Sequence, residues 1–515
     1  MRKWLPLVTV LSGSFMLLVD VTVVNVALPA MASDLSASFS SLQWVVDVYA
    51  LVLAALVLGA GSISDLIGHR RAYIGGLALF AASSLACGLA PNAEVLIAAR
   101  IVQGIGAAGM FATVFALLNS NYSGRERGTA YGLWGAVAGT SAAIGPIVGG
   151  VLTEVVSWRW VFFVNLPVSA IAIALSFVVL RDVHAPAKGR VDVLGVLTFT
   201  AAASALTYGL IRSNEHGWSQ PHSWIWFVAG PALLALFIVV ELKVPQPMLD
   251  LGLMRNRSFV GVLLAAFFMS FSAFAAVTYT SIWLQSVRDM SPIQVGFTGL
   301  PLAVASFAAS AVIGRFLHTA RPGPLIAGGL VLVGVGGIVG GLLMHGPAGW
   351  LSLVPGNVLV GAGAGLATPT LSSAAMGSVP VERGGMAAGA VNTARQLGFA
   401  LGIAVLGSVF SARAAHILSE HNVPGSAEAS RALGGGQAPA LLRAVPTDRR
   451  AALDSALEAA SVGGVSWTLW VSGLTGVLCG LAVFYLVRPD RADEHEPAPG
   501  ADPTGQPVAR RPRLR

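Results

Sequence analysis

Ionisable or polar side chains interrupt several of the apolar stretches in this 515-residue sequence. Asp20 and Asn25 lie in the run LLVDVTVVNVALP, and Asp47, Arg100 and Arg395 lie in later apolar runs. Inside a membrane such groups are costly unless they face a partner or a water-filled cavity. Burial favours the protonated form of a carboxylate and a nearby cation favours the ionised form, so an aspartate held between the two influences can exchange a proton near neutral pH. The chemistry that these residues predict is reversible proton binding.

Asp20 and Arg100 are the predicted proton-coupling residues. Counted from the outer ends of their helices at about 1.5 Å per residue, Arg100 lies roughly 9 Å deep and Asp20 roughly 16 Å deep, a difference that a long arginine side chain spans. We expect the two charges to interact directly or through water. The structural alternative for Asp20 is a buried carboxylate bonded to Thr22, Asn25 or a neighbouring helix, and for Arg100 it is a clamp on backbone carbonyls.

The other polar residues in these runs give weaker signals. Asp47 lies close to the outer end of its run, where a coupling role is the alternative to contact with the membrane surface. Arg395 is expected either to neutralise a carboxylate or to bind backbone in the second half of the chain. Four amides are expected to line the transport path or, more simply, to join helices by hydrogen bonds: Gln103, Asn165, Asn392 and Gln396.

Motifs for enzymatic chemistry are absent from the sequence. It contains no glycine-rich loop ending in Gly-Lys-Ser/Thr, no Gly-x-Ser-x-Gly elbow and no His-Glu-x-x-His pair. His416 and His421 are close together in the sequence, and a solvated pair is favoured over a metal site there. The sequence therefore predicts no enzyme, no cofactor and no metal.

The composition predicts a membrane protein, because 55% of the residues are hydrophobic and only 11% are charged, whereas a soluble domain has about 25% charged residues. A helix needs about 20 apolar residues to cross a bilayer, and fourteen stretches of that kind recur along the chain. They lie near 7–31, 42–64, 71–91, 94–121, 127–153, 159–181, 191–211, 223–242, 258–285, 292–318, 323–345, 349–376, 385–415 and 465–487. The first is expected to be a span and not a cleaved signal peptide, because it is too long and carries two polar residues.

Basic residues divide unevenly between the two sides of the predicted spans. Thirteen Lys and Arg residues fall in the six short loops on the side of the N-terminus, and three fall in the six short loops on the opposite side. Because positively charged loops stay on the inner side, both termini are expected in the cytoplasm and the chain in the cell membrane. The net charge of +7 indicates contact with anionic membrane lipids and not with nucleic acid.

Seven stretches resemble, in order, the signatures of the fourteen-span drug:proton antiporters in the major facilitator superfamily. They are LLVDVTVVNVALP at 17–29, GSISDLIGHRR at 61–71, AARIVQGIGAAG at 98–109, GTSAAIGPIVGG at 139–150, WRWVFFVNLP at 158–167, PMLDLGLMRNRSF at 247–259 and RGGMAAGAVNTARQLGFALG at 383–402. The resemblance covers roughly residues 7–487. It implies an all-α polytopic membrane protein with the major facilitator fold, made of two six-helix bundles plus two additional central transmembrane helices.

The resemblance also assigns roles to residues. Arg100 stands at a position that the family uses in proton coupling. The loop at 61–71 corresponds to the family's gating loop, although Leu66 and His69 stand where basic residues are usual. The fifth span carries the antiporter signature, which is expected to bend this helix and seal one face of a cavity, or only to pack the helix tightly. The gating-loop residues are Gly61, Asp65, Gly68, Arg70 and Arg71, and the antiporter residues are Gly145, Pro146, Gly149 and Gly150.

The expected division of the chain follows from this resemblance. Residues 1–181 are the N-terminal six-helix bundle, 191–242 are the additional pair (spans 7 and 8), and 258–487 are the C-terminal six-helix bundle. An outer loop at 416–464 interrupts the second bundle. Residues 488–515, rich in Pro, Asp, Glu and Arg, are expected to form a disordered cytoplasmic tail.

The outer loop contains the segment TDRRAALDSALEAA, which has helical spacing of its apolar residues. One interpretation is a helix whose Leu453, Ala456, Leu457 and Ala460 face the bilayer surface. A solvated helix and a disordered segment are the alternatives.

The predicted function is a proton-coupled antiporter, acting as a monomer, that exports small lipophilic compounds such as drugs from the cytoplasm. Its partners are the substrate, protons and membrane lipids. The alternative is a selective exporter of one metabolite, siderophore or lipid-like molecule by the same cycle. A membrane sensor that binds a ligand without transport is the third hypothesis.

Overall fold

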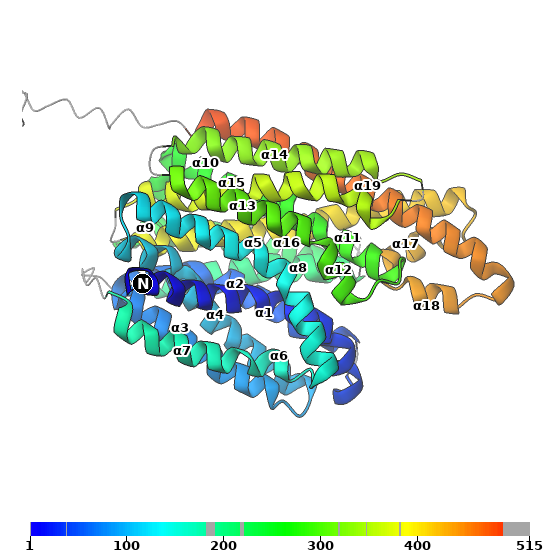
Figure 1. Cartoon of the computed structure of the whole chain (residues 1–515), viewed down its shortest axis with the longest axis horizontal. Coiled ribbons are helices and arrows are strands. Elements are labelled where there is room, and N and C mark those ends of the chain that lie inside the picture. The colour runs from blue at the N-terminus through cyan, green and yellow to red at the C-terminus, as the bar shows by residue number, and fades with distance from the viewer. Residues whose placement is uncertain are drawn as a thin grey trace, which may run out of the picture.

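The computed structural model describes residues 2–37, 39–181, 191–216, 221–317, 320–346, 348–380 and 383–487. Within these residues every regular element is a helix, and most helices run along the long axis of the molecule (Figure 1). The all-α prediction is therefore confirmed. The predicted tail at 488–515 lies outside the described residues.

The first half of the chain forms helices α1 to α9. Their bounds are α1 Leu5–Leu35, α2 Phe39–Ile67, α3 His69–Gly88, α4 Ala93–Asn121, α5 Gly124–Val155, α6 Trp160–Phe163, α7 Asn165–Val179, α8 Val193–His216 and α9 Pro221–Lys243. Side chains at the helix ends help to set these bounds: the Oδ1 atom of Asn92, for example, accepts a hydrogen bond of 2.9 Å from the backbone of Val95 at the start of α4.

The second half forms helices α10 to α19. Their bounds are α10 Arg257–Met269, α11 Ala275–Ser286, α12 Pro292–Thr298, α13 Leu300–Phe316, α14 Pro322–Leu343, α15 Val354–Gly377, α16 Gly384–Glu420, α17 Ser426–Gly434, α18 Ala438–Arg443 and α19 Thr447–Leu486. A π-helical turn at Ser270–Phe274 separates α10 from α11, and Gly299 separates α12 from α13. Two stretches predicted as single spans are therefore broken helices.

Twelve candidate spans in the described residues are long and apolar enough to cross a membrane. Two further helices, α5 with 32 residues and α8 with 24, coincide with the fifth and seventh predicted stretches. Short 3₁₀ turns at Arg2–Trp4, Leu251–Arg255 and Trp350–Leu353 precede α1, α10 and α15. The helices together account for all fourteen apolar stretches.

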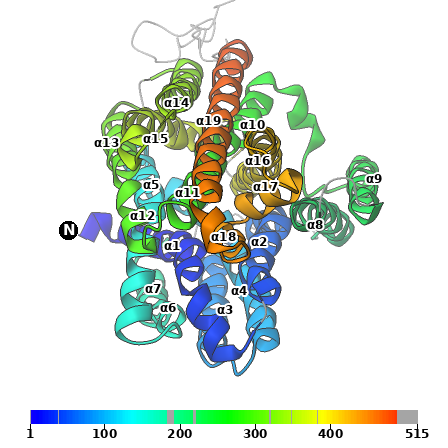
Figure 2. The same cartoon turned by 90° about the vertical axis from the view of Figure 1, so that its right-hand side faces the viewer.

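The long helices gather in two groups that meet along two seams. In the first group α1 packs on α5 and α7, and α4 packs on α2 and α3. In the second group α14 packs on α15 and α19, and α16 packs on α10 and α19. The seams are α5 against α13 and α2 against α16 (Figure 2). This is a fold of two helical bundles, as the sequence predicts.

The additional pair, α8 and α9, is central only in the sequence. In space α8 packs on α2 and α16, and α9 packs on α8 and lies outermost (Figure 2). The outward side chains of α9 are large and apolar, among them Trp224, Ile225 and Val228. An exposed apolar face of this length suits contact with lipid.

Glycines set the close packing of the second bundle. A Cβ atom on Gly334 would lie 2.6 Å from the carbonyl oxygen of Gly473, and one on Gly336 would lie 2.7 Å from that of Gly356. These contacts join α14 to α19 and α15 through backbone atoms. In lipid, where apolar burial gives helices little reason to associate, such close backbone approach is the main packing device.

The end of the molecule opposite the N-terminus carries a helical extension made of the last turns of α16, α17, α18 and the start of α19 (Figure 1). The helix predicted in the outer loop is present as the first part of α19. Its position on the bilayer surface was wrong: Ala456, Leu457 and Ala460 are buried in one hydrophobic cluster with Leu418 and Leu433. The apolar stripe of this helix is covered by the protein itself.

Candidate functional site

Asp20 and Arg100 form an ion pair in the interior of the first bundle. The Nη1 atom of Arg100 lies 2.5 Å from the Oδ2 atom of Asp20, and both side chains have 0% exposure. Asp20 comes from the middle of α1 and Arg100 from the first third of α4. The contact expected from their depths in the sequence is present as a direct hydrogen bond.

Two amides complete the hydrogen bonding of this carboxylate. The Oδ1 atom of Asp20 accepts hydrogen bonds from Gln103 Nε2 at 3.2 Å and from Asn165 Nδ2 at 3.1 Å. Both amides also donate to the hydroxyl of Ser84, at 2.8 and 3.3 Å respectively. Side chains from α1, α3, α4 and α7 therefore meet in one buried network.

Arg100 is held from three further directions. Its Nε atom donates to the carbonyl oxygen of Val45 at 2.9 Å, and its Nη1 atom also donates to Gln103 Oε1 at 2.7 Å. The guanidinium carbon lies 4.0 Å from the centre of the Tyr49 ring and 5.9 Å from that of Phe162. Such cation–π contacts stabilise a desolvated guanidinium, although its Nη2 atom has no hydrogen-bond partner.

The arrangement suits an ionised carboxylate. Three donors converge on Asp20, and an ionised carboxylate is the form that only accepts hydrogen bonds. These donors belong to α4 and α7 and the acceptor to α1. The negative charge of Asp20 therefore strengthens hydrogen bonds that hold three helices together.

Other predicted members lie outside this network. Asp47 is partly exposed in α2 and is not among the side chains bonded to Asp20 or Arg100. Asn25 lies in α1, and its side chain is outside the described residues. Arg395 contacts neither a carboxylate nor a backbone carbonyl within the described chain, so neither of its two expected partners is found.

Sequence reasoning missed part of the network. Ser84, which follows Ser83, and Tyr49 lie in apolar helices with no motif around them. Ser84 is an acceptor for both amides, and Tyr49 presents its ring to the guanidinium. The only signal for Ser84 in the sequence was that it is a polar side chain within an apolar helix.

The predicted gating loop joins the two bundles at the end of the molecule that carries the N-terminus. The carboxylate of Asp65 accepts hydrogen bonds from the backbone of Gly385 at 2.7 Å and of Met386 at 2.9 Å. These two amides belong to the first turn of α16, where the helix dipole favours a negative charge. A Cβ atom on Gly61 would lie 2.2 Å from the carbonyl oxygen of Gly385, so α2 and α16 touch through backbone.

The remaining loop residues position α3. Gly68 has a φ of 97°, a conformation that side chains rarely adopt, and it directly precedes α3. Arg70 donates to the carbonyl oxygen of Phe177 at 2.6 Å, which ties α3 to the end of α7. His69 Nε2 lies 3.7 Å from Asp65 Oδ1. Arg71 is exposed in the first turn of α3.

Two glycines of the predicted antiporter signature let α5 approach α1. A Cβ atom on Gly145 would lie 1.8 Å from the Oγ1 atom of Thr22, and one on Gly149 would lie 2.7 Å from the carbonyl oxygen of Val23. This geometry agrees with tight helix packing. Any sealing of a cavity by this region stays a prediction.

The same signature touches the second bundle. A Cβ atom on Gly150 would lie 2.6 Å from a side-chain carbon of Ile293 in α12. The side chain of Pro146 is outside the described residues, while the helix itself runs without interruption from Gly124 to Val155. α5 therefore contacts α1 on one face and the second bundle on another.

Metal-binding geometry is not found in the described ranges: no three His, Cys, Asp or Glu side chains there are grouped to hold an ion. His416 Nδ1 lies 3.3 Å from Glu420 Oε1, whereas His421 Nδ1 lies 2.9 Å from the carbonyl oxygen of Ile417. The two histidines thus have different partners.

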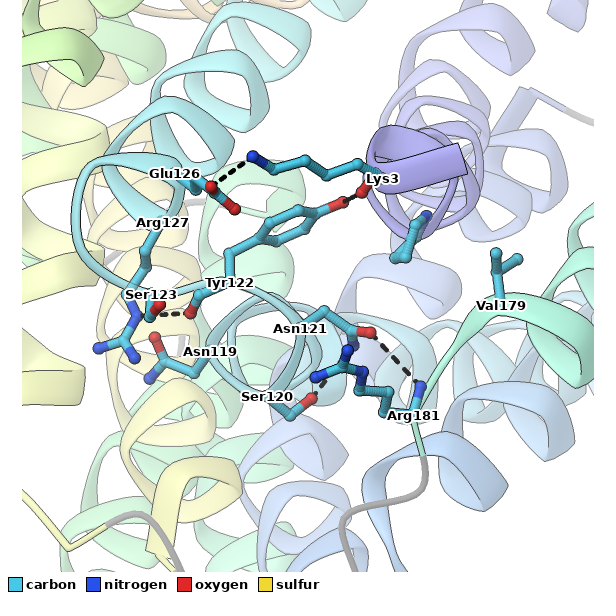
Figure 3. Close-up of a pocket in the computed structure, with 11 residues that line it drawn as sticks. Lys3, Asn119, Ser120, Asn121, Tyr122, Ser123, Glu126, Arg127, Val179 and Arg181 are labelled. Atoms are coloured by element: carbon cyan, nitrogen blue, oxygen red, sulfur yellow. Dashed lines mark hydrogen bonds and ion pairs between the residues drawn. The ribbon is translucent and has the colours of Figure 1, made fainter. Parts of the chain in front are cut away.

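A polar cavity of about 540 Å³ opens at the N-terminal end of the first bundle (Figure 3). Lys3 Nζ lies 2.5 Å from Glu126 Oε1, and the Tyr122 hydroxyl donates to the carbonyl oxygen of Lys3 at 3.1 Å. Arg181 closes the opposite wall, where its backbone donates to Asn121 Oδ1 at 3.4 Å (Figure 3). The cavity ties the start of α1 to the α4–α5 turn and contains no residue of the Asp20 network.

Comparisons with known proteins agree with this architecture. The profile of the Major Facilitator Superfamily matches residues 10–403. The puromycin resistance protein pur8 of Streptomyces alboniger is 34% identical over 82% of this chain and 84% of its own length. The multidrug resistance protein Stp of Mycobacterium tuberculosis is 33% identical over 79% of this chain and 76% of its own length.

A solved structure shows the same fold at low sequence identity. The human organic anion transporter MFSD10 (TETRAN) superimposes with a TM-score of 0.60 at 15% identity, covering 94% of this chain and 99% of that one. At this identity the likeness concerns the fold alone. The predicted major facilitator fold is confirmed, while the division into bundles at 1–181 and 258–487 with a pair at 191–242 stays a prediction.

Proposed function

Because the chain belongs to the major facilitator superfamily, we propose that it is a proton-coupled antiporter that exports small lipophilic compounds from the cytoplasm. The relatives named above confer resistance to puromycin and to multiple drugs, and drugs or antibiotics are accordingly the proposed cargo. The chain acts as a carrier without enzymatic chemistry and as a monomer.

The observation that carries the proposal is the buried ion pair between Asp20 and Arg100. An ion pair in the interior of a membrane protein costs desolvation energy that ordinary packing does not require. Here the bonded side chains come from three helices, so a proton that neutralises Asp20 weakens the contact of α1 with α4 and α7. We propose that this change alternates the exposure of the substrate site.

The proposed orientation places both termini in the cytoplasm and the chain in the plasma membrane, from the thirteen-to-three excess of basic residues on that side. The contact of Asp65 with α16 then lies at the cytoplasmic end, where it holds the two bundles together. Release of this contact would open the cytoplasmic side. We assign residues 1–181 and 258–487 to the moving bundles and 191–242 to a pair carried by α2 and α16.

Energetically the proposed cycle is feasible. Each pH unit across the membrane supplies about 1.4 kcal/mol per proton, and each net charge that crosses gains about 2.3 kcal/mol per 100 mV. A single proton per cycle therefore drives a roughly tenfold or larger concentration ratio of substrate. An apolar site discriminates poorly among apolar compounds, which favours a broad substrate range over a selective exporter.

The experiment is substrate-triggered proton release. The purified full chain is placed in acid-loaded liposomes with a pH-sensitive dye inside, and lipophilic cations, neutral antibiotics and organic acids are added outside one at a time. We expect at least one class to accelerate proton efflux. Binding of a compound without any proton movement or flux would favour a sensor and contradict the proposed antiport.

A further inference from the structure

Arg395 lies near the middle of the membrane, between the two bundles. It is eleven residues into α16, which begins at Gly384, and this places it about 16 Å from that helix end, close to the centre of a hydrocarbon core of about 30 Å. Its guanidinium carbon is 5.5 Å from the centre of the Trp134 ring in α5. The residue therefore bridges the second bundle and the first.

No acceptor for the Arg395 guanidinium is found in the described residues. In the described part of the chain Arg395 makes no hydrogen bond and no ion pair, and its Nε atom is fully buried without a partner. A guanidinium carries five N–H donors, and contact with a ring face satisfies none of them. Arg395 as a whole keeps partly exposed surface, and of its nitrogen atoms only Nε is among the described buried atoms without a partner.

Neighbouring polar groups are unpaired as well. Asn392, one helical turn before Arg395, donates to the carbonyl oxygen of Phe111 at 3.4 Å but leaves its Oδ1 atom without a partner. The hydroxyl of Thr393 and the Nε1 atom of Trp134 are also buried and unpaired. Buried polar groups are normally satisfied, and several unsatisfied ones together indicate a place where a ligand completes the hydrogen bonding.

Three acidic side chains are buried in the described residues, Asp20, Asp192 and Glu241, and Asp65 is partly buried. Asp20 is bonded to Arg100, and Asp65 is bonded to the amides of the first turn of α16. Glu241 and Asp192 belong to the peripheral pair, where they accept hydrogen bonds from Leu249 and Gly195. Among the residues that the structure describes, the positive charge of Arg395 at the midplane is thus uncompensated.

We propose that Arg395 binds the carboxylate or phenolate group of a lipophilic organic anion, with Trp134 as a positioning residue and Asn392 as a second polar contact. This inference rests on the proposed export function and names its substrate class. Guanidinium is the group best suited to carboxylate, because two parallel N–H donors match two oxygens. A membrane potential that is negative inside favours both the exit of an anion and the entry of a proton, so it drives both halves of this exchange.

The test compares two ligands that differ only in charge. The full chain in lipid nanodiscs is titrated with anthraquinone carboxylate and with its methyl ester, and binding is measured by quenching of tryptophan fluorescence and by calorimetry. We expect the acid to bind at least roughly tenfold more tightly than the ester, as a charge-assisted hydrogen bond implies. Equal binding of the two, or no binding of the acid, would overturn the assignment without any variant.

Two arginine variants locate the preference. Arg395→Gln is expected to abolish the preference for the acid and to leave binding of the ester unchanged. Arg413→Gln is the matched control, because Arg413 lies on the same helix, is 5.9 Å from the Trp467 ring centre and also has an unpaired Nε atom. Arg413 is about 44 Å from the start of α16 and thus beyond the hydrocarbon core, so this variant should retain the preference.

The outcomes separate this inference from the function on which it rests. Transport of tetraphenylphosphonium with no preference for the acid would retain the exporter and overturn the Arg395 site. A clear preference for the acid, lost in Arg395→Gln, with no transport of any compound would retain the site and overturn the exporter. A preference that persists in Arg395→Gln but is lost in Arg413→Gln would also overturn the assignment.

Discussion

The Oδ2 atom of Asp20 and the Nη1 atom of Arg100 are 2.5 Å apart, although the two residues are separated by 80 positions in the sequence. Neither side chain is exposed. Removal of one partner of such a pair leaves an uncompensated buried charge, which costs about 3–5 kcal/mol. The pair therefore holds α1 against α4, and in the proposed mechanism it is the position at which a proton breaks that contact.

Arg100→Lys is expected to stop transport while the charge is kept. Lysine has one ammonium group and cannot reach the Val45 carbonyl and Asp20 together, so at least one hydrogen bond to a charged group is lost, at about 1.5–3 kcal/mol. Thermal unfolding in detergent should shift downward and substrate-triggered proton release should vanish.

The control for this variant is Arg159→Lys. Arg159 forms an ion pair with Asp34 at the opposite end of α1, and both side chains are partly exposed. Exposed pairs contribute about 0–1 kcal/mol, so stability and transport should change little. Full transport by Arg100→Lys would show that the geometry of the guanidinium is dispensable.

Asp65→Asn is expected to loosen the contact between the bundles. The variant keeps one acceptor for Gly385 and Met386 but removes the negative charge from the helix start, at a cost of about 1–2 kcal/mol. Leu58 lies buried against Gly389, between α2 and α16. A cysteine at this position should react with a water-soluble maleimide roughly 5- to 30-fold faster in the Asp65→Asn variant than in the natural sequence.

The matched control is Asp250→Asn in the same background, in which Cys87 and Cys479 are replaced by alanine. Asp250 pairs with Arg383 at the same end of the molecule, but both side chains are substantially exposed. Its loss should leave the labelling rate nearly unchanged. Equal labelling of the Asp65→Asn variant and the natural sequence would contradict a closing role for this contact.

Gly149→Ala is expected to destabilise the first bundle. The added Cβ atom would lie 2.7 Å from the backbone oxygen of Val23, and backbone cannot move aside as a side chain can. Overpacking of this kind costs about 1–3 kcal/mol. Gly75→Ala in α3 meets nothing within 4 Å and should be neutral or stabilising by up to about 1 kcal/mol. Similar unfolding temperatures for the two variants would contradict the packing argument.

The sequence alone was sufficient to predict the membrane-spanning helices and the contact between Asp20 and Arg100. Apolar stretches of bilayer length predict the spans because lipid leaves the backbone no other partner than itself. The Asp20–Arg100 contact was predictable because two buried charges of opposite sign at similar depth have few alternatives. Gly145 and Gly149 predicted close approach of helices, because small residues are the main device by which helices pack in lipid.

The partners of these residues were not predictable in the same way. Ser84 and Tyr49 belong to the network through the rotation of α3 and α2, which tertiary packing decides. A position of Leu453 and its neighbours on the bilayer was one of three interpretations, because their spacing fixes only a helical face. The sequence does not say that α16 and α17 cover that face. The unpaired state of Arg395 was also not predictable, because it depends on the absence of acceptor side chains from the described parts of the facing helices.

The most direct measurement is proton release by Asp20→Asn compared with Asp34→Asn in acid-loaded liposomes. Both aspartates lie on α1, but Asp20 is buried with Arg100 whereas Asp34 is partly exposed and bonded to Trp158 and Arg159. Substrate addition should release protons through Asp34→Asn and the natural protein at similar rates, and not through Asp20→Asn, which should still bind substrate. Undiminished proton release by a folded Asp20→Asn protein would contradict proton coupling at Asp20.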